Sequence, residues 1–534
     1  MKPYYLTTPL YYVNAPPHLG HAYTTVIADV LARYHRLRGD QVFFLTGTDE
    51  HGQKIQQAAA AAGKPPQQFA DEIVPNFTAL WKALNVSYDD FIRTTEPRHR
   101  CGVQAALTRL FEQKQIVKDT YEGWYCTPCE TFWPKPVFAS AGPGAGVAAP
   151  GTLAQVPLAA TPTPGPLCPD CRRPVEQITE QNYFFPLEPH RRWLVDYIRS
   201  HESFIIPASR RNEVLAFLDQ PLQSLCISRP KARLSWGIPL PFDTDYVTYV
   251  WFDALLNYIT AVGYPDAGHA RWPSWPADLH LIGKDILRPH AVYWPIMLHA
   301  LDLPLPETVA VHGWWLVEGE KMSKSRGNVV DPHAVIAEFG VDAYRYLLLR
   351  EISFGQDGTF SEQALEKRYT ADLANDLGNL LYRTLTMLEK YCEGTIPQRG
   401  GTAGFVSGGP TADAVTKALE RWAFDVVLGQ LWGLVASGNA VIDREKPWIL
   451  AKDPAQAGRL RELLTALADT LRALAVWLWP FMPTTSEKIW AQLGCPGKLD
   501  DVRWDDAWRP GATAGQKIQK GPPLFPRREP SPKG

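Results

Sequence analysis

Hydrophobic positions along the first 115 residues alternate between two patterns, one typical of buried strands and one typical of helices. Aromatic and β-branched residues form short continuous runs, and between these runs the apolar side chains recur at helical spacing. Prolines and glycines separate the two patterns, as at residues 14–17 and at Gly39. The predicted elements are strands at residues 4–8 and 42–45 and helices at residues 22–34, 54–62 and 65–84. This alternation predicts an α/β fold with a doubly wound parallel sheet.

The alternation is interrupted at residues 116–227 and returns at residues 228–320. In the second stretch the predicted elements are strands at residues 247–252, 280–283 and 308–311 and helices from residue 253 and over residues 285–301. The sheet is therefore predicted to be split into two halves, residues 1–115 and 228–320, by an inserted segment.

Helical periodicity dominates the chain after residue 361. Apolar residues recur at helical spacing over residues 368–391, 412–443, 447–451 and 460–493. We expect residues 366–510 to form an all-α helix bundle after a connecting region at residues 321–365. The tail, residues 511–534, is rich in Pro, Gly and Lys and is predicted to be extended.

The composition is that of a globular protein of about three or four domains. The chain has 534 residues, of which 45% are hydrophobic and 21% charged, and its net charge is −2. A nucleic-acid partner would need local patches of Lys and Arg, because there is no overall basic field. No apolar run is as long as a membrane span and the chain starts directly in a predicted strand, so we expect a cytoplasmic protein with no membrane partner.

The inserted segment contains two C-x-x-C pairs. Cys126 and Cys129 form the first pair, and Cys168 and Cys171 form the second. Four thiolates from two such turns are the ligand set of a structural zinc ion. A redox-active pair and solitary buried thiols are the alternatives, but a redox site needs only one pair. Between the pairs, residues 139–166 are almost entirely Ala, Gly, Pro, Val and Thr, which predicts a flexible loop.

A phosphate site is predicted where the first strand leads into the first helix. His18, Gly20 and His21 lie at this junction. A helix N-terminus offers backbone N–H groups and a positive dipole end to an anion, and a glycine lets a flat ligand approach the backbone. Two imidazoles three residues apart also fit a metal site or a helix cap, so this segment alone leaves three interpretations open.

A second segment favours the nucleotide interpretation. The sequence Lys-Met-Ser-Lys-Ser occupies residues 321–325, far along the chain. H-x-G-H early and K-M-S-K-S late, in that order, is the double signature of class I aminoacyl-tRNA synthetases. With the segments at residues 11–18, 47–52, 249–254 and 312–314, nearly the whole chain resembles the methionyl-tRNA synthetase family.

The resemblance implies a split Rossmann-type catalytic domain, a zinc-binding connective insertion and a helix-bundle domain that binds the anticodon. The implied reaction forms methionyl-adenylate from L-methionine and ATP and then transfers the methionyl group to the terminal adenosine of tRNA(Met). No protein nucleophile is needed, because orientation and charge stabilisation at phosphorus account for the catalysis. Zn²⁺ would be structural and Mg²⁺ would accompany ATP. No C-terminal dimerisation domain follows the bundle, so the resemblance predicts a monomer.

The resemblance also assigns residues to each ligand. The implied catalytic residues are His18, His21, Lys321 and Lys324, and with Gly20 and Ser323 they would bind ATP. The implied methionine site comprises Leu10, Tyr12, Asp49, Trp251, Ala254, Leu255, Tyr258, Ile286 and His290. Aromatic edges suit a thioether, and a carboxylate suits the α-ammonium group. Without the family pattern, scattered aromatic residues are more often part of a core.

Three residues of the helical region are implied to read the CAU anticodon of the tRNA. Asn379 and Arg383 lie four residues apart, on one face of a predicted helix, and Trp448 follows Pro447. Flat aromatic and guanidinium groups stack on unpaired bases, as recognition of single-stranded RNA requires. As an alternative, Trp448 is a core residue of the bundle.

Two other classes of function compete with this prediction. A nucleotidyl transferase of the HxGH type that acts on a small metabolite would explain His18 and His21 but not the helix bundle. A non-catalytic tRNA-binding relative would have lost one of the two signatures, and both are intact. Synthetases for branched apolar amino acids are usually longer and carry an editing insertion. The sequence therefore predicts a methionine-specific ligase.

Overall fold

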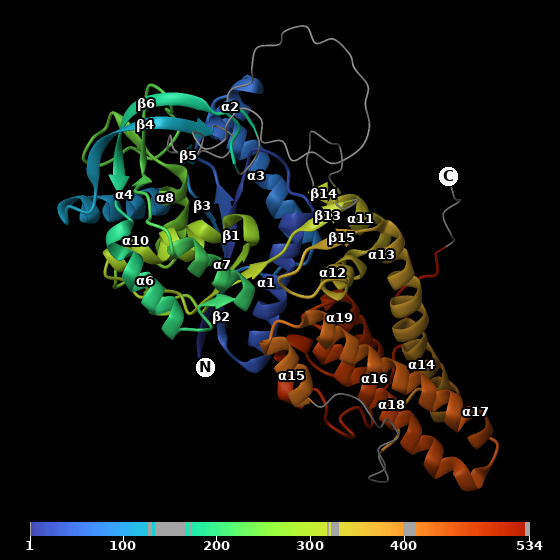
Figure 1. The fold of residues 1–534 in the computed structure, drawn as a ribbon. Coiled ribbons are helices and arrows are strands. Elements are labelled where there is room, and N and C mark those ends of the chain that lie inside the picture. The colour runs from blue at the N-terminus through green and yellow to red at the C-terminus, as the bar shows by residue number, and fades with distance from the viewer. Residues whose placement is uncertain are drawn as a thin grey trace, which may run out of the picture.

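An α/β body and a helix bundle make up the protein, and the bundle extends away from the body (Figure 1). The computed structural model describes residues 2–126, 131–133, 166–169, 173–317, 320–321, 330–398 and 412–528. The predicted flexible loop at residues 139–166 therefore lies, apart from its last residue, outside the described residues.

A six-stranded parallel sheet, formed by described residues, organises the body. Its strand order is β3-β2-β1-β11-β12-β7. Its strands are β1 (Pro3–Tyr12), β2 (Gln41–Asp49), β3 (Asp90–Arg93), β7 (Ile205–Ile206), β11 (Leu279–Gly283) and β12 (Thr308–His312). The chain builds outward from β1 through β2 to β3 and later continues on the other side with β11 and β12. The order reverses between β1 and β11, and a parallel sheet places its ligand crevice at the carboxyl ends of the strands at such a point.

The sheet is covered on both faces, as the prediction of a doubly wound α/β fold requires. Tyr5 and Leu6 are neighbours in β1, yet they belong to two different hydrophobic clusters because successive side chains of a strand point to opposite faces. The cluster that contains Leu6 also contains apolar side chains of α1 (Leu19–Arg38) and α3 (Pro66–Ala83). The cluster that contains Tyr5 takes in α4 (Pro97–Glu112), α6 (Glu188–Ser200), α7 (Ala208–Leu218), α9 (Asn257–Thr260) and α10 (Trp294–Ala300). The predicted fold class is thus confirmed.

The segment inserted between β3 and β11 forms a second, antiparallel sheet. Its described strands follow the order β5-β4-β6-β8. These are β4 (Val117–Cys126), β5 (Thr131–Trp133), β6 (Glu176–Phe185) and β8 (Leu225–Cys226), and a separate pair joins β9 (Ser228–Pro230) to β10 (Tyr246–Thr248). Strand β7 of the same stretch pairs with β12 and so attaches the insertion to the main sheet.

Two stretches near the centre of the chain differ in detail from the predicted elements. Strand β10 ends at Thr248, and residues 250–255 are already helical, so Trp251 lies on a helix. The predicted helix over residues 285–301 has a 3₁₀ turn, a π-helical turn and an α-helix in succession. Other described elements that precede the helix bundle are α2 (Gln53–Ala61), α8 (Val250–Leu255), β13 (Trp315–Val317), β14 (Glu320–Lys321), α11 (Pro332–Phe339), α12 (Val341–Arg350) and β15 (Gly358–Phe360).

The helix bundle follows as predicted. Its helices are α13 (Glu362–Arg368), α14 (Asn379–Cys392), α15 (Ala412–Glu420), α16 (Phe424–Glu445), α17 (Pro447–Leu450), α18 (Ala457–Leu478) and α19 (Pro483–Gln492), with a π-helical stretch between α13 and α14. One stretch, Phe424–Leu450, is long and apolar enough to cross a membrane by length and composition alone, and half of its most apolar part is buried in the protein. The apolar side chains of α16 belong to the same core as α1 and α3, which accounts for this composition.

Candidate active site

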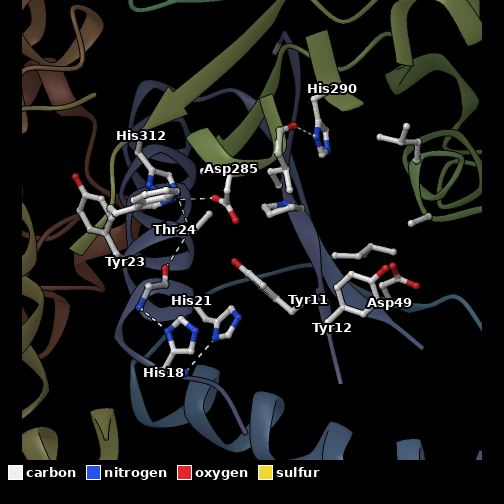
Figure 2. Close-up of a pocket in the computed structure, with 18 of the residues that line it drawn as sticks. Tyr11, Tyr12, His18, His21, Tyr23, Thr24, Asp49, Asp285, His290 and His312 are labelled. Atoms are coloured by element: carbon white, nitrogen blue, oxygen red, sulfur yellow. Dashed lines mark hydrogen bonds between the residues drawn. The ribbon is translucent and has the colours of Figure 1, made fainter. Parts of the chain in front are cut away.

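A cavity of about 260 Å³ lies at the carboxyl ends of β1, β2, β11 and β12, beside the N-terminus of α1. Figure 2 shows side chains from these distant segments directed toward one space. Among its lining residues are twelve of the predicted site residues: Leu10, Tyr12, His18, Gly20, His21, Asp49, Trp251, Ala254, Leu255, Tyr258, Ile286 and His290. The structure therefore brings the predicted nucleotide and amino-acid sites together in one cavity.

His18 and His21 cap helix α1 reciprocally. The backbone N–H of Gly20 donates to His18 Nδ1 (3.1 Å), and the backbone N–H of His18 donates to His21 Nδ1 (3.0 Å). An imidazole whose Nδ1 accepts a hydrogen bond carries its proton on Nε2 when neutral. The two rings, with centroids 4.0 Å apart, thus offer two Nε2–H donors next to the positive end of a helix. Of the three interpretations from sequence, helix capping and anion binding are compatible with each other here.

Burial keeps His21 neutral. Desolvation, with a smaller contribution from neighbouring His18, lowers the pKa of His21 well below 6.5. Gly20 is tightly packed against the same histidine pair. A Cβ at this position would lie 3.0 Å from His18 Cε1, so any side chain would press on the ring. A neutral hydrogen-bond donor at a fixed position suits a phosphate oxygen that gains charge during a reaction.

The opposite part of the cavity has aromatic and apolar walls. Tyr258 donates its hydroxyl hydrogen to His290 Nε2 (2.7 Å), because His290 Nδ1 is committed to donating to the carbonyl of Ile286 (2.9 Å). Burial lowers the pKa of His290 to about 4, so this ring is neutral at physiological pH. The ring of Tyr258 in turn stacks on His280, with the ring centroids 4.1 Å apart. The stacked, hydrogen-bonded rings form a rigid wall that an unbranched apolar side chain can pack against.

The carboxylate of Asp49 lies at the end of this apolar part of the cavity. Asp49 is the last residue of β2 and is only 3% exposed. In Figure 2 it lies beside Tyr12 and away from the His18–His21 pair. A carboxylate at the end of an apolar pocket can hold a small ammonium group, because the opposite charges attract and the ammonium group donates hydrogen bonds to the carboxylate oxygens.

Several lining residues have no counterpart among the predicted site residues. Thr24 of α1 donates to His312 Nε2 (2.7 Å), because the other ring nitrogen donates to the carbonyl of Gly313. Trp314 donates its indole hydrogen to Asp285 Oδ1 (3.2 Å). His312 ends a buried strand, and the carboxyl-end rule for parallel sheets was the available signal for it.

The lysine-rich loop begins at the edge of the cavity. Trp315 of β13 lines the cavity, and the next residue of that strand, Leu316, pairs with the backbone of Lys321 in β14. The Lys321 side chain and the whole of Ser323 and Lys324 lie outside the described residues. Their predicted role at the nucleotide therefore stays a prediction.

The two predicted zinc knuckles come together through their described members. Cys126 and Cys168 are both buried and form one small cluster with Val175 and Trp124. The backbone N–H of Cys168 donates to the carbonyl of Arg173 (2.8 Å), so these two described residues of the second knuckle lie side by side. Cys129 and Cys171 lie outside the described residues. Two buried thiols from separate knuckles fit half of a tetrahedral four-sulfur site.

The three predicted anticodon residues occupy the bundle. Asn379 begins α14, and Arg383 one turn later pairs with Asp443 of α16 (2.6 Å). Trp448 lies on α17 with 44% of its surface exposed, which excludes the alternative that it is a core residue. In Figure 1, α17 is at the tip of the bundle, remote from the α/β body.

Comparisons with known proteins match nearly the whole chain. A family model described as "tRNA synthetases class I (M)" matches residues 4–385, and one described as "Anticodon-binding domain of tRNA ligase" matches residues 410–517. The methionine–tRNA ligase of Caldanaerobacter subterraneus is 45% identical over 532 residues, which cover 98% of this chain and 79% of that relative. The ligase of the same name from Bacillus subtilis is 44% identical over 538 residues, covering 98% and 78%.

Solved structures agree with the sequence relatives. Mycobacterium tuberculosis methionyl-tRNA synthetase in complex with methionyl-adenylate has a TM-score of 0.90 and 38% identity, covering 99% of this chain and 100% of that one. The apo form of that protein has a TM-score of 0.84 and 35% identity, covering 99% of each chain. The agreement extends over both the α/β body and the helix bundle.

Proposed function

The chain belongs to the methionyl-tRNA synthetase family of class I aminoacyl-tRNA synthetases, and we propose from this premise that its cavity activates L-methionine with ATP and that the protein charges tRNA(Met). One observation carries the proposal. The paired histidines and the aromatic pocket with the carboxylate of Asp49 line the same cavity, so a nucleotide phosphate and an amino acid can meet there.

In the first step a carboxylate oxygen of methionine attacks the α-phosphorus of ATP. The new P–O bond gives methionyl-adenylate, and the bond to pyrophosphate breaks. Asp49 holds the α-ammonium group, and Tyr12, Trp251, Tyr258 and His290 surround the thioether. The apolar lining is completed by Leu10, Ala254, Leu255 and Ile286. Holding both reactants at contact distance lowers the barrier without a protein nucleophile.

Charge at phosphorus is balanced by donors from two segments. His18 and His21 donate from Nε2 to phosphate oxygens, and Gly20 leaves room for the nucleotide. Lys321, Ser323 and Lys324 bind the departing pyrophosphate, with Lys324 as the main charge partner. Mg²⁺ accompanies ATP and is held largely by phosphate oxygens and water.

In the second step a ribose hydroxyl of the terminal adenosine of tRNA(Met) attacks the adenylate carbonyl. In class I enzymes this is first the 2′-hydroxyl. The ester forms as the bond between the carbonyl carbon and the bridging oxygen breaks, so AMP leaves with the oxygen that came from the methionine carboxylate. In both reaction steps, the protein acts by orienting its substrates and stabilising charge.

A structural Zn²⁺ is proposed for the insertion. Cys126 and Cys168 supply two buried sulfurs, and Cys129 and Cys171 complete the set of four. The ion would hold the two knuckles against one another near the acceptor end of the tRNA, away from the reacting atoms. A cytoplasmic location, where translation takes place, stays a prediction.

The proposal is tested by ATP–pyrophosphate exchange with different amino acids. Exchange is expected with L-methionine and not with isoleucine or valine, because an unbranched thioether suits the aromatic wall of the cavity better than a β-branched side chain does. Radiolabelled pyrophosphate incorporated into ATP measures the reaction. Absence of exchange with methionine, or equal exchange with isoleucine, would overturn the assignment.

Replacing Trp448 with alanine separates the two steps. This exposed side chain lies far from the cavity, so exchange should keep its wild-type rate, whereas aminoacylation of tRNA(Met) should lose the stacking energy of one base, about 1–3 kcal/mol. The measurement compares kcat/KM for tRNA with the exchange rate. Replacing exposed Trp508, at the end of the bundle region, with alanine is the control, and equal loss in both assays would indicate a folding role instead.

A further inference from the structure

A buried cluster of ionisable groups lies behind the cavity and does not line it. Asp253 of α8 accepts one hydrogen bond from His51 Nδ1 (2.7 Å) and another from His99 Nε2 (2.7 Å). All three side chains are at least 95% buried. On its far side, His99 Nδ1 is 2.9 Å from the hydroxyl of Thr260.

The chemistry of the cluster fixes its protonation pattern. A carboxylate only accepts hydrogen bonds, so both imidazoles must donate to it. Burial raises the pKa of Asp253, but the charge and hydrogen bonds of His51 and His99 outweigh burial and lower it below its usual value. A buried charge of this kind is stable only while both partners remain in place.

The cluster joins the two segments that form the amino-acid end of the cavity. His51 lies two residues after Asp49, and Asp253 lies two residues after Trp251. Asp49 and Trp251 both line the cavity, and so do Ala254 and its neighbour Leu255. His99 ties the same carboxylate to α4, whose Gly102 packs so closely on Thr260 that a Cβ there would lie 2.3 Å from its Cγ2.

The loop that carries Asp49 is held from its other side as well. Glu50 is fully buried and binds Arg93 through both carboxylate oxygens, at 2.6 and 2.8 Å. Trp236 donates its indole hydrogen to the carbonyl of Glu50. With this side clamped to β3, the bond from His51 to Asp253 is the contact that sets the position of the loop relative to α8.

We propose that Asp253 is a positioning residue for the amino-acid substrate: through His51 it fixes the spacing between the carboxylate of Asp49 and the ring of Trp251. The inference rests on the proposed function and adds a residue that never touches the substrate. Asp49 holds the ammonium group of methionine and Trp251 contacts its side chain. The spacing between these two residues therefore decides whether both parts of the substrate can bind at the same time. The ATP end of the cavity, built on α1 and β12, is independent of this bond.

The test is Asp253→Asn in the full-length protein, assayed by pyrophosphate exchange. An amide oxygen can still accept from one imidazole, but its NH₂ faces the other donor, so one contact is lost without a change of volume. We expect the KM for methionine to rise about 10- to 100-fold while the KM for ATP stays within about threefold of wild type. The matched control is Asp469→Asn, another buried carboxylate with N–H partners, in the bundle and remote from the cavity. It should leave the KM for methionine unchanged.

A second pair of variants separates positioning from folding. In His51→Asn the amide nitrogen takes the place of Nδ1 and can still donate to Asp253, whereas His51→Leu removes the donor. The methionine KM should be near wild type in the first and raised as in Asp253→Asn in the second. Equal KM values in the two variants, or a parallel rise in the KM values for methionine and ATP, would overturn the inference. Failure of wild-type protein to exchange with methionine would instead reject the proposed function.

Discussion

Replacing Arg345 with methionine is expected to lower the free energy of unfolding by about 3–5 kcal/mol, the usual effect of removing one partner of a buried ion pair. Arg345 lies on α12 and is fully buried. Its guanidinium donates to Asp29 Oδ2 of α1 (2.7 Å) and to the carbonyl of Leu84 (3.0 Å). It also donates to the carbonyls of Pro480 and Phe481, at 2.8 and 2.9 Å. Methionine fills the space but satisfies none of these four acceptors.

The loss is large because Asp29 stays ionised. Burial raises its pKa, but Arg33, Arg345 and two hydrogen bonds from Ser87 outweigh burial and hold the pKa of Asp29 at about 2. The carboxylate therefore remains charged in the variant, with Arg33 as its remaining cationic partner at 2.8 Å. The variant thus loses one of the two cationic partners of a buried carboxylate, and water cannot reach the closed interior to replace the lost donor.

Urea unfolding followed by circular dichroism measures the effect, and Arg368→Met is the matched control. Arg368 also bridges two carboxylates, of Glu351 and Asp372, but it is partly exposed. A pair of that kind contributes about 1 kcal/mol or less. If both variants unfolded at the same urea concentration, Arg345 would not be the contact that joins the body to the bundle.

The position of Arg345 links stability to the site. Asp342, one turn earlier on α12, accepts the backbone N–H of Thr485 in the first turn of α19. Helix α12 thus holds the α18–α19 corner through two side chains and holds α1 through Asp29. Because the N-terminus of α1 carries His18 and His21, the same buried contacts that join the two parts of the molecule also fix the orientation of the phosphate-binding end.

The sequence predicted the elements whose pattern is local. The strand ending before residue 14 and the helix ending at Gly39 follow from periodicity and from the left-handed conformation of that glycine, which has φ of 89°. The order of the strands was not predicted, because it depends on which segments pair across the insertion. The helical state of Trp251 was harder to predict, because an aromatic and β-branched run fits either a strand or a buried helix.

Contacts between distant segments carry no local signal. Thr24 and His312 are 288 residues apart, and although each lies in or beside a family-pattern segment, nothing in the sequence shows that their side chains meet. His51, His99 and Asp253 come from three separate parts of the chain, and nothing in the sequence shows that the two imidazoles bind the same carboxylate. The predicted site residues were accessible only because their spacing resembles a family pattern; the residues that hold them in place became visible with the fold.

Replacing His21 with asparagine is expected to lower the rate of adenylate formation about 10²- to 10³-fold, the usual effect of removing one donor from a developing oxyanion. The asparagine oxygen can take the place of Nδ1 and accept the backbone N–H of His18, so the helix cap is kept. The Nε2–H donor is lost. Replacement by glutamine does the opposite, because its amide nitrogen reaches the position of Nε2 while the cap is lost.

The two variants therefore assign the function of His21 to one nitrogen or the other. If phosphate stabilisation is its role, His21→Gln should retain most of the single-turnover rate and His21→Asn should not. A dominant capping role would reverse that order. Since burial lowers the pKa of His21 well below 6.5, the neutral ring acts as the donor, and the wild-type advantage over His21→Asn should stay constant between about pH 6.5 and 8. An advantage that fell as the pH rose through this range would mean that the imidazolium, and not the neutral ring, contacts the phosphate.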